Sequence, residues 1–178
     1  MRYKKFILRY IILIFIIISF SCNSEEETDK KQGIKHSKES LEEVNKLLVS
    51  KDAEQIKSYV DRRGWNMELT ESGLWFMIYN EGTGSLIKKG DHISIIFEVW
   101  LLNGTLCYSS DELGIKSFVV GSGGVESGLE EGVLMLKNGS KARFILPPHL
   151  AHGLIGDENR IPARASIVYD IEIFKIED

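Results

Sequence analysis

The first run of regularly spaced hydrophobic residues lies in residues 37–62. Its apolar side chains recur at helical spacing, at Leu41, Val44, Leu47, Leu48, Ile56, Tyr59 and Val60. This spacing predicts one or two helices, and Ser40 with Glu43 and Asp52 with Gln55 resemble capping boxes at helix starts. A stripe of this kind usually packs on its own domain. We therefore expect core packing, with a dimer seam as the alternative, although the stripe is short for a coiled coil.

From residue 71 the pattern changes to the alternation of half-buried strands. The predicted strands lie in residues 73–79, 92–102, 106–110, 116–121, 141–147 and 166–176. The stretch at 92–102 is rich in β-branched and aromatic residues, which favours a central strand. Asn103-Gly104 is a hairpin signal. In the last strand Ile167, Tyr169 and Ile171 share one face with Ile173.

One helix interrupts the strands, with Leu129, Val133 and Leu136 at helical spacing and an end expected near Asn138-Gly139. Strands in sequence order with one amphipathic helix between them indicate an α+β fold, in which the helix covers one face of an antiparallel sheet.

The N-terminus predicts export. Residues 1–21 hold a basic start and an apolar run of about 11 residues that ends before Cys22. That run is short for a bilayer span, which needs roughly 20 residues, and suits a signal peptide. The sequence before Cys22 resembles a lipobox, so we expect lipidation at Cys22, with an uncleaved anchor or plain secretory cleavage as alternatives. Residues 22–36, polar and acidic, predict a flexible tether.

Four segments follow: a lipoprotein signal peptide at 1–21, the tether at 22–36, a helical segment at 37–70 and a globular domain at 71–178. A lipidated Cys22 cannot form a disulfide, which leaves Cys107 as a lone thiol. The formal net charge of −4 becomes −8 once residues 1–21, with four cations and no anions, are removed. This acidity argues against nucleic-acid binding.

The sequence shows no catalytic nucleophile signature and no phosphate-binding glycine loop. The glycines at 121, 123 and 124 lack the spacing and strand context of a dinucleotide site. His149 and His152 could supply two metal ligands, but zinc takes three or four, and His36 and His92 offer no obvious third. We therefore expect neither a metal nor a cofactor.

Three stretches, residues 88–110, 125–156 and 161–176, resemble in order and spacing the FKBP-type peptidyl-prolyl isomerase domain. The resemblance covers residues 74–176 and is closest to lipid-anchored FKBP-like proteins of gliding bacteria, including gliding-motility-associated isomerases. It implies a twisted antiparallel half-barrel of about five strands wrapped around one short helix, here preceded by the N-terminal helical segment.

The resemblance implies a proline pocket that works without covalent catalysis. Its residues map to Glu98, Cys107, Tyr108, Phe118, Val125, Glu126, Leu129, His152, Ile161 and Tyr169. Several depart from the family pattern: Glu98 stands for a tyrosine, Cys107 for a phenylalanine and Glu126 for an isoleucine. Lys116 replaces another pocket aromatic, and a one-residue register slip would turn Glu98 outward. His152 replaces a tyrosine that donates a hydrogen bond to the substrate, and His149 is expected to face solvent.

The implied function is peptidyl-prolyl cis-trans isomerisation that assists folding of exported or cell-surface proteins, with low-to-moderate activity. The alternative is an FKBP-like binding or chaperone module, weak or inactive as an enzyme, in a surface or motility complex. Expected partners are Xaa-Pro segments of client proteins, and the membrane through a lipid on Cys22. We expect a monomer, an outer-membrane lipoprotein facing the periplasm or the cell surface.

Overall fold

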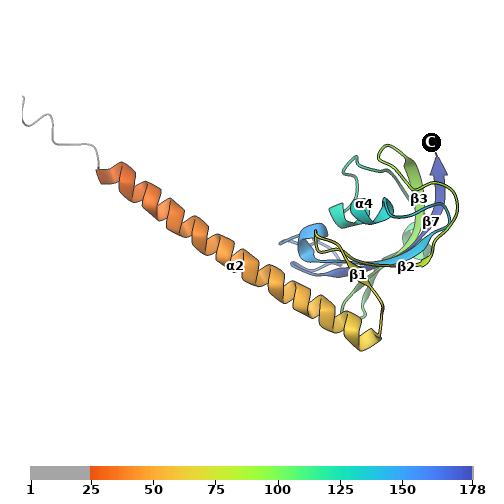
Figure 1. Ribbon diagram of the computed structural model, residues 1–178, viewed down its shortest axis with the longest axis horizontal. Coiled ribbons are helices and arrows are strands. Elements are labelled where there is room, and N and C mark those ends of the chain that lie inside the picture. Colours follow the sequence, from red (N-terminus) through yellow and green to blue (C-terminus); the bar gives the residue numbers. More distant parts are fainter. Residues whose placement is uncertain (1–24, 178) are drawn as a thin grey trace, which may run out of the picture. The chain divides into compact units, whose positions relative to one another are not determined.

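The computed structural model describes residues 25–177, and the side chains of residues 41–174 within them (Figure 1). The predicted signal peptide and Cys22 lie outside these residues. The chain divides into two compact units, residues 1–47 and 48–178, which are described separately. Among the described helices, none has both the length and the apolar character that a membrane crossing demands.

The N-terminal helical prediction needs two corrections. Helix α2 runs without interruption over Glu25–Arg63, so it starts inside the stretch predicted to be a tether, and neither predicted capping box begins a helix. Asp52 instead lies within the helix and pairs with Arg164 at 2.8 Å.

Seven strands form one antiparallel sheet in the described chain. They are β1 Glu68–Leu69, β2 Trp75–Asn80, β3 His92–Leu101, β4 Leu106–Ser109, β5 Lys116–Val119, β6 Lys141–Leu146 and β7 Ile167–Glu177. The order is β1-β2-β6-β7-β3-β4, and β5 pairs with β3 beyond β4 along the same edge. The α+β prediction is confirmed, with β1 as a short strand that the sequence did not signal.

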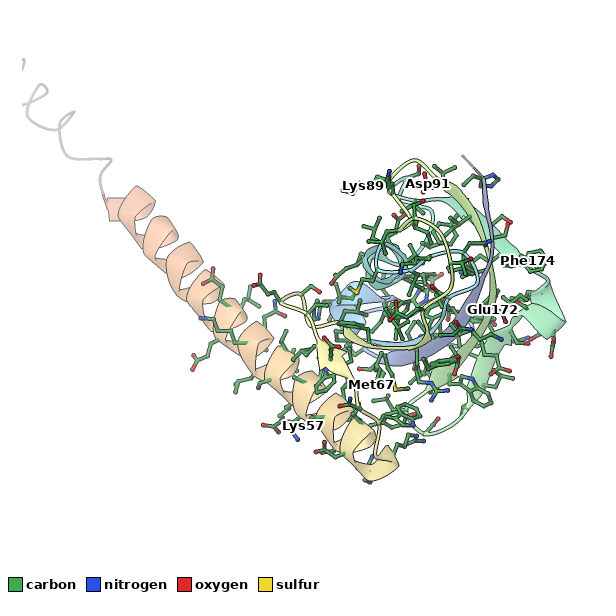
Figure 2. The ribbon with its side chains drawn as sticks, turned by 45° about the vertical axis from the view of Figure 1, so that its right-hand side comes forward. Lys57, Met67, Lys89, Asp91, Glu172 and Phe174 are labelled. Carbon is green, nitrogen blue, oxygen red and sulfur yellow. The ribbon has the colours of Figure 1, made fainter. Side chains whose placement is uncertain are left out.

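Strands β3 and β7 pair over most of their length, and neither of them is an edge strand. On β7 the predicted alternation is confirmed, because Ile167, Tyr169, Ile171 and Ile173 are all buried in the main core. The neighbours on the other face include Glu172 and Phe174, and Phe174 is 55% exposed (Figure 2). One face of β7 therefore packs in the main core, whereas the other face includes solvent-exposed side chains.

The inner face of the sheet curls around helix α4, Ser127–Val133 (Figure 1). Two glycines of this helix allow close packing against β6: an added Cβ would lie 2.6 Å from Cγ of Leu146 at Gly128, and 2.7 Å from the Phe144 ring at Gly132. Helix α4 ends earlier than predicted, because Met135 and Leu136 bond back three residues and tighten the chain into turns.

A second, smaller core lies on the outer face of the sheet. Ile56, Tyr59 and Val60 of α2 are buried there together with Ile145 and Val168 of the sheet. Core packing is thus confirmed for the C-terminal half of the helical stripe. It is wrong for the N-terminal half, where Leu41, Val44 and Leu47 are all more than half exposed.

Two short helices complete the connections. Helix α3, Ser110–Leu113, follows β4 and is capped by the Ser109 hydroxyl, which accepts from the Glu112 N–H. The 3-10 helix η1, Pro148–Leu150, follows β6 and begins the loop that leads through His152 to β7.

Candidate functional site

Most of the predicted pocket residues belong to the inner core or border it. Phe118 comes from β5, Leu129 from α4 and Tyr169 from β7, and all three are buried in the main cluster with Cys107 and Ile161. Val125 and Tyr108 pack against this cluster while remaining partly exposed. Together with Phe97, Glu126 and His152, we call this group the candidate site. Segments far apart in the sequence thus supply one apolar floor with a partly accessible edge.

The assignment of Glu98 to this site is wrong, and Phe97 takes the place. Phe97 is buried, with its ring centroid 6.3 Å from that of Tyr169, whereas Glu98 is exposed and accepts a hydrogen bond from the Trp100 indole at 3.2 Å. Phe97 shares the buried face of β3 with Ile93 and Ile95, but the apolar Ile96 on the opposite face weakens this alternation in the sequence. The floor is therefore more aromatic than the sequence mapping implied.

A polar cluster crosses the candidate site. The Tyr169 hydroxyl donates to Glu126 Oε1 at 2.9 Å, and Lys116 Nζ donates to the same hydroxyl at 3.4 Å. The Lys116 ammonium also lies 5.3 Å from the centroid of the Phe97 ring, within cation–π range. Burial, followed by the charge of Glu126, raises the pKa of Tyr169 well above its usual value. Tyr169 therefore stays protonated and acts as a donor.

His152 is turned toward this cluster. Its Nε2 lies 3.0 Å from Glu126 Oε1, but without hydrogen-bond alignment, so His152 Nε2 and Glu126 Oε2 are both buried without a hydrogen-bond partner. His152 was predicted to donate a hydrogen bond to the substrate. In the structure the Glu126 carboxylate already lies beside its Nε2 atom. His149 is exposed, and its Nε2 lies 2.9 Å from the Ser72 carbonyl. Its imidazole therefore lies outside the candidate site, unlike that of His152.

The loop between η1 and β7 is fixed by Asp157. Its carboxylate accepts from the Tyr108 hydroxyl and, at 2.7 Å, from the Ile161 N–H. Burial pushes the pKa of Asp157 upward, but these hydrogen bonds outweigh it and the pKa is lowered. The next arginine, Arg160, pairs with Glu112 of α3 at 2.5 Å and donates to the Cys107 carbonyl. Asp157 was not among the residues predicted, since its side-chain partner Tyr108 is distant in sequence.

Cys107 stands where the resemblance implies a phenylalanine. It is a free, buried thiol, and burial raises its pKa, followed by the nearby charge of Asp157. A protonated thiol is a small apolar wall residue rather than a nucleophile. A cysteine in place of the family's phenylalanine reduces the aromatic surface of the floor without adding a charge.

Two hollows lie elsewhere, along the outer face of the sheet. They measure about 230 and 300 Å³ and share Glu98 and Asp170. Asp170 is bonded to Tyr79 and Arg143, and Glu98 to Trp100. Their linings are largely charged and hydrogen-bonded groups, which suit a proline ring less well than the inner apolar floor.

The family of this chain is identified by comparison with known protein families. The profile described as FKBP-type peptidyl-prolyl cis-trans isomerase matches residues 84–174, about half of the chain, from before β3 into β7. The chain belongs to this family. The FKBP match contains every residue of the candidate site, from Phe97 to Tyr169.

Relatives and solved structures agree with this assignment. The FKBP-type isomerase FkpA of Aeromonas hydrophila is 33% identical over 77% of this chain and 53% of its own length. Human isomerase FKBP9 is 38% identical over 51% of this chain, but only 16% of that protein is covered. A probable FKBP-type isomerase of Haemophilus influenzae is 28% identical over 83% of this chain and 65% of its own. The chain thus spans less than two thirds of the length of these FKBP relatives.

Solved structures share the FKBP fold. FkpA from Escherichia coli superimposes with a TM-score of 0.64 at 22% identity, covering 98% of this chain and 82% of that one. AtFKBP13 gives a TM-score of 0.60 at 28% identity, covering 64% of this chain and all of that one. The first likeness is evidence for the fold alone.

Proposed function

We propose that this FKBP chain catalyses cis–trans isomerisation of Xaa-Pro bonds. The proposal is supported by the burial of Leu129, Phe118 and Tyr169 in one apolar core, with the Phe97 ring 6.3 Å from that of Tyr169. Such a floor can hold a proline ring without any covalent step.

The physical basis is the barrier of the amide bond. Rotation about an Xaa-Pro bond is opposed by about 18–20 kcal/mol of amide resonance, and uncatalysed exchange takes tens to hundreds of seconds. The twisted transition state has lost that resonance, so a site that positions the proline and matches the twisted form accelerates exchange. A backbone donor, mapped by the family resemblance to the Glu126 N–H, fixes the carbonyl beside the proline.

The test is NMR exchange spectroscopy on a short Leu-Pro peptide with the full-length protein in mild detergent. We expect accelerated exchange, and we expect Phe118→Ala or Tyr169→Ala to reduce it more than His149→Ala does. His149 is a suitable control because its imidazole meets the Ser72 carbonyl outside the site. Folding of each variant is checked by circular dichroism. Exchange at the background rate with micromolar folded protein would refute the enzyme proposal.

A second candidate is a non-enzymatic FKBP module that binds client segments. The observation in its favour is the polar cluster, because the Glu126 carboxylate lies where the family has an apolar side chain. A buried charge beside a proline ring weakens apolar contact. In that case peptides bind to the candidate site, seen as shifts of its resonances, while the exchange rate stays at background.

We also propose where the protein acts. A lipid on Cys22 would hold it at the outer membrane, on the periplasmic face or the cell surface, where exported proteins fold; the sequence around Cys22 supports this. Membership of a gliding-motility-related group rests on the same sequence resemblance. Cys22→Ala should move the protein from the membrane to the soluble fraction, and continued retention would argue against a lipid anchor.

A further inference from the structure

The side chain of Glu126 does not cap the helix that follows it. Glu126 is the N-cap residue of α4, and its carboxylate makes no hydrogen bond to the N–H groups of the first turn. Instead the carboxylate is directed into the candidate site, where the side chain is only 10% exposed. Backbone capping therefore does not explain why a carboxylate is buried here.

The carboxylate is also incompletely paired. Oε1 receives the Tyr169 hydroxyl, whereas Oε2 is buried without a hydrogen-bond partner. Lys116 does not neutralise it, because its ammonium bonds to the Tyr169 hydroxyl and lies over aromatic rings, and it forms no ion pair with Glu126 among the described residues. A buried charge in this state is costly until a donor or a cation arrives.

The imidazole near this carboxylate also lies near a second carboxylate. His152 Nε2 lies 3.0 Å from Glu126 Oε1, and His152 is also close to Asp157, so the imidazole stands between two carboxylates. Asp157 is satisfied by Tyr108 and by backbone N–H groups, which leaves Glu126 Oε2 as a buried acceptor without a hydrogen-bond partner. A ligand that supplies a positive donor would complete the cluster.

We propose that Glu126 is a specificity-determining residue that selects prolyl bonds with a lysine or arginine next to the proline. The proposal rests on the proposed isomerase function. An ammonium or guanidinium offers several N–H donors together with positive charge, which an incompletely paired carboxylate needs. A leucine at the same position leaves Oε2 unsatisfied. The formal net charge of −4 also draws basic segments to the molecule.

The test compares peptides that differ only beside the proline. Exchange rates are measured for Leu-Pro, Lys-Pro, Pro-Leu and Pro-Lys peptides with the full-length protein and with Glu126→Gln, which removes the charge but keeps the size. We expect the wild type to favour the lysine peptide of at least one pair by about 10-fold in kcat/KM, the effect of one charged hydrogen bond. In Glu126→Gln the ratio of the lysine-peptide rate to the leucine-peptide rate should fall to near unity.

Two further variants separate the local contact from general attraction. Glu98→Gln removes the same charge from the outer face of the sheet and should keep the preference. Glu126→Ile introduces the family's apolar residue, provides a second variant if the glutamine protein fails to fold, and should favour the leucine peptides. Equal rates for lysine and leucine peptides in the wild type, or a preference that survives in Glu126→Gln, would overturn the proposal.

The failure of the enzyme proposal is distinguishable from failure of this one. If no peptide is isomerised, the same four peptides are titrated by NMR. Tighter binding of the lysine peptides, lost in Glu126→Gln and kept in Glu98→Gln, then supports the specificity proposal for a binding module. Equal affinities for lysine and leucine peptides would reject it.

Discussion

Replacing Gly132 by alanine tests whether α4 is held against the sheet by close packing. The added Cβ would lie 2.7 Å from two carbons of the Phe144 ring, and Phe144 is fully buried in β6. Neither the helix nor the strand can move freely to relieve this contact. Overpacking of a core costs about 1–3 kcal/mol, while alanine gains about 0.5–1 kcal/mol over glycine within a helix.

The difference predicts a net loss of about 1 kcal/mol, which corresponds to a fall in Tm of roughly 4 °C for a domain of this size. Thermal and urea unfolding followed by near-ultraviolet circular dichroism would measure it. Gly124→Ala is the matched control, because nothing lies within 4 Å of an added Cβ there, and it should change stability by less than about 0.5 kcal/mol.

A double variant identifies the ring as the cause. In a Phe144→Leu background the methyl at position 132 has more room, so its cost should shrink, giving a coupling energy of at least about 0.5 kcal/mol. A Gly132→Ala protein that is as stable as the wild type, or more stable, would refute the packing argument. If Gly132→Ala destabilises the Phe144→Leu protein as much as the wild type, the Phe144 ring is not the cause of the destabilisation.

Three other predictions follow from the site. Phe97→Ala should reduce isomerisation or client binding at least about 10-fold, because it removes a buried ring beside Tyr169. Glu98→Ala should change either quantity little. Equal effects of the two substitutions would contradict the assignment of Phe97, rather than Glu98, to the candidate site. Asp157→Ala should lower stability at neutral pH. Since the folded pKa of Asp157 lies below its unfolded value, its contribution is present above about pH 4 and is lost as the pH falls through the lowered folded pKa, so the two proteins should converge in acid unfolding curves. Native Cys107 should react slowly with iodoacetamide at pH 8 and rapidly in urea, as followed by mass spectrometry; fast native labelling would contradict the burial and raised pKa of the thiol.

The sequence predicted the course of the strands because their faces differ in polarity. On β7 the inward set from Ile167 to Ile173 alternates with Asp170 and Glu172, and a period of two over seven residues leaves one register. On β3 the outward positions include Ile96 and Trp100, so apolar residues occur on both faces. The alternation there is weak, which is why Glu98 was assigned in place of Phe97.

The polar cluster could not be predicted in the same way. Glu126, Lys116 and Tyr169 come from three separate segments. No local pattern indicates that the Tyr169 hydroxyl will donate to Glu126 and accept from Lys116. The extent of α2 was missed for a related reason, since polar sequence at positions 25–36 is compatible with either helix or disorder.

The ion pair between Asp52 and Arg164, together with the outer core, has a mechanical consequence. If the chain is pulled from its N-terminal side, the load reaches residues 48–178 first at this ion pair and at Ile56, Tyr59 and Val60, which rest on the back of β6 and β7. These contacts would yield by peeling from the outer surface. The hydrogen bonds of β7 to β3 and β6 would carry tension only afterwards, so the inner face that holds Tyr169 would stay closed while the outer contacts separate.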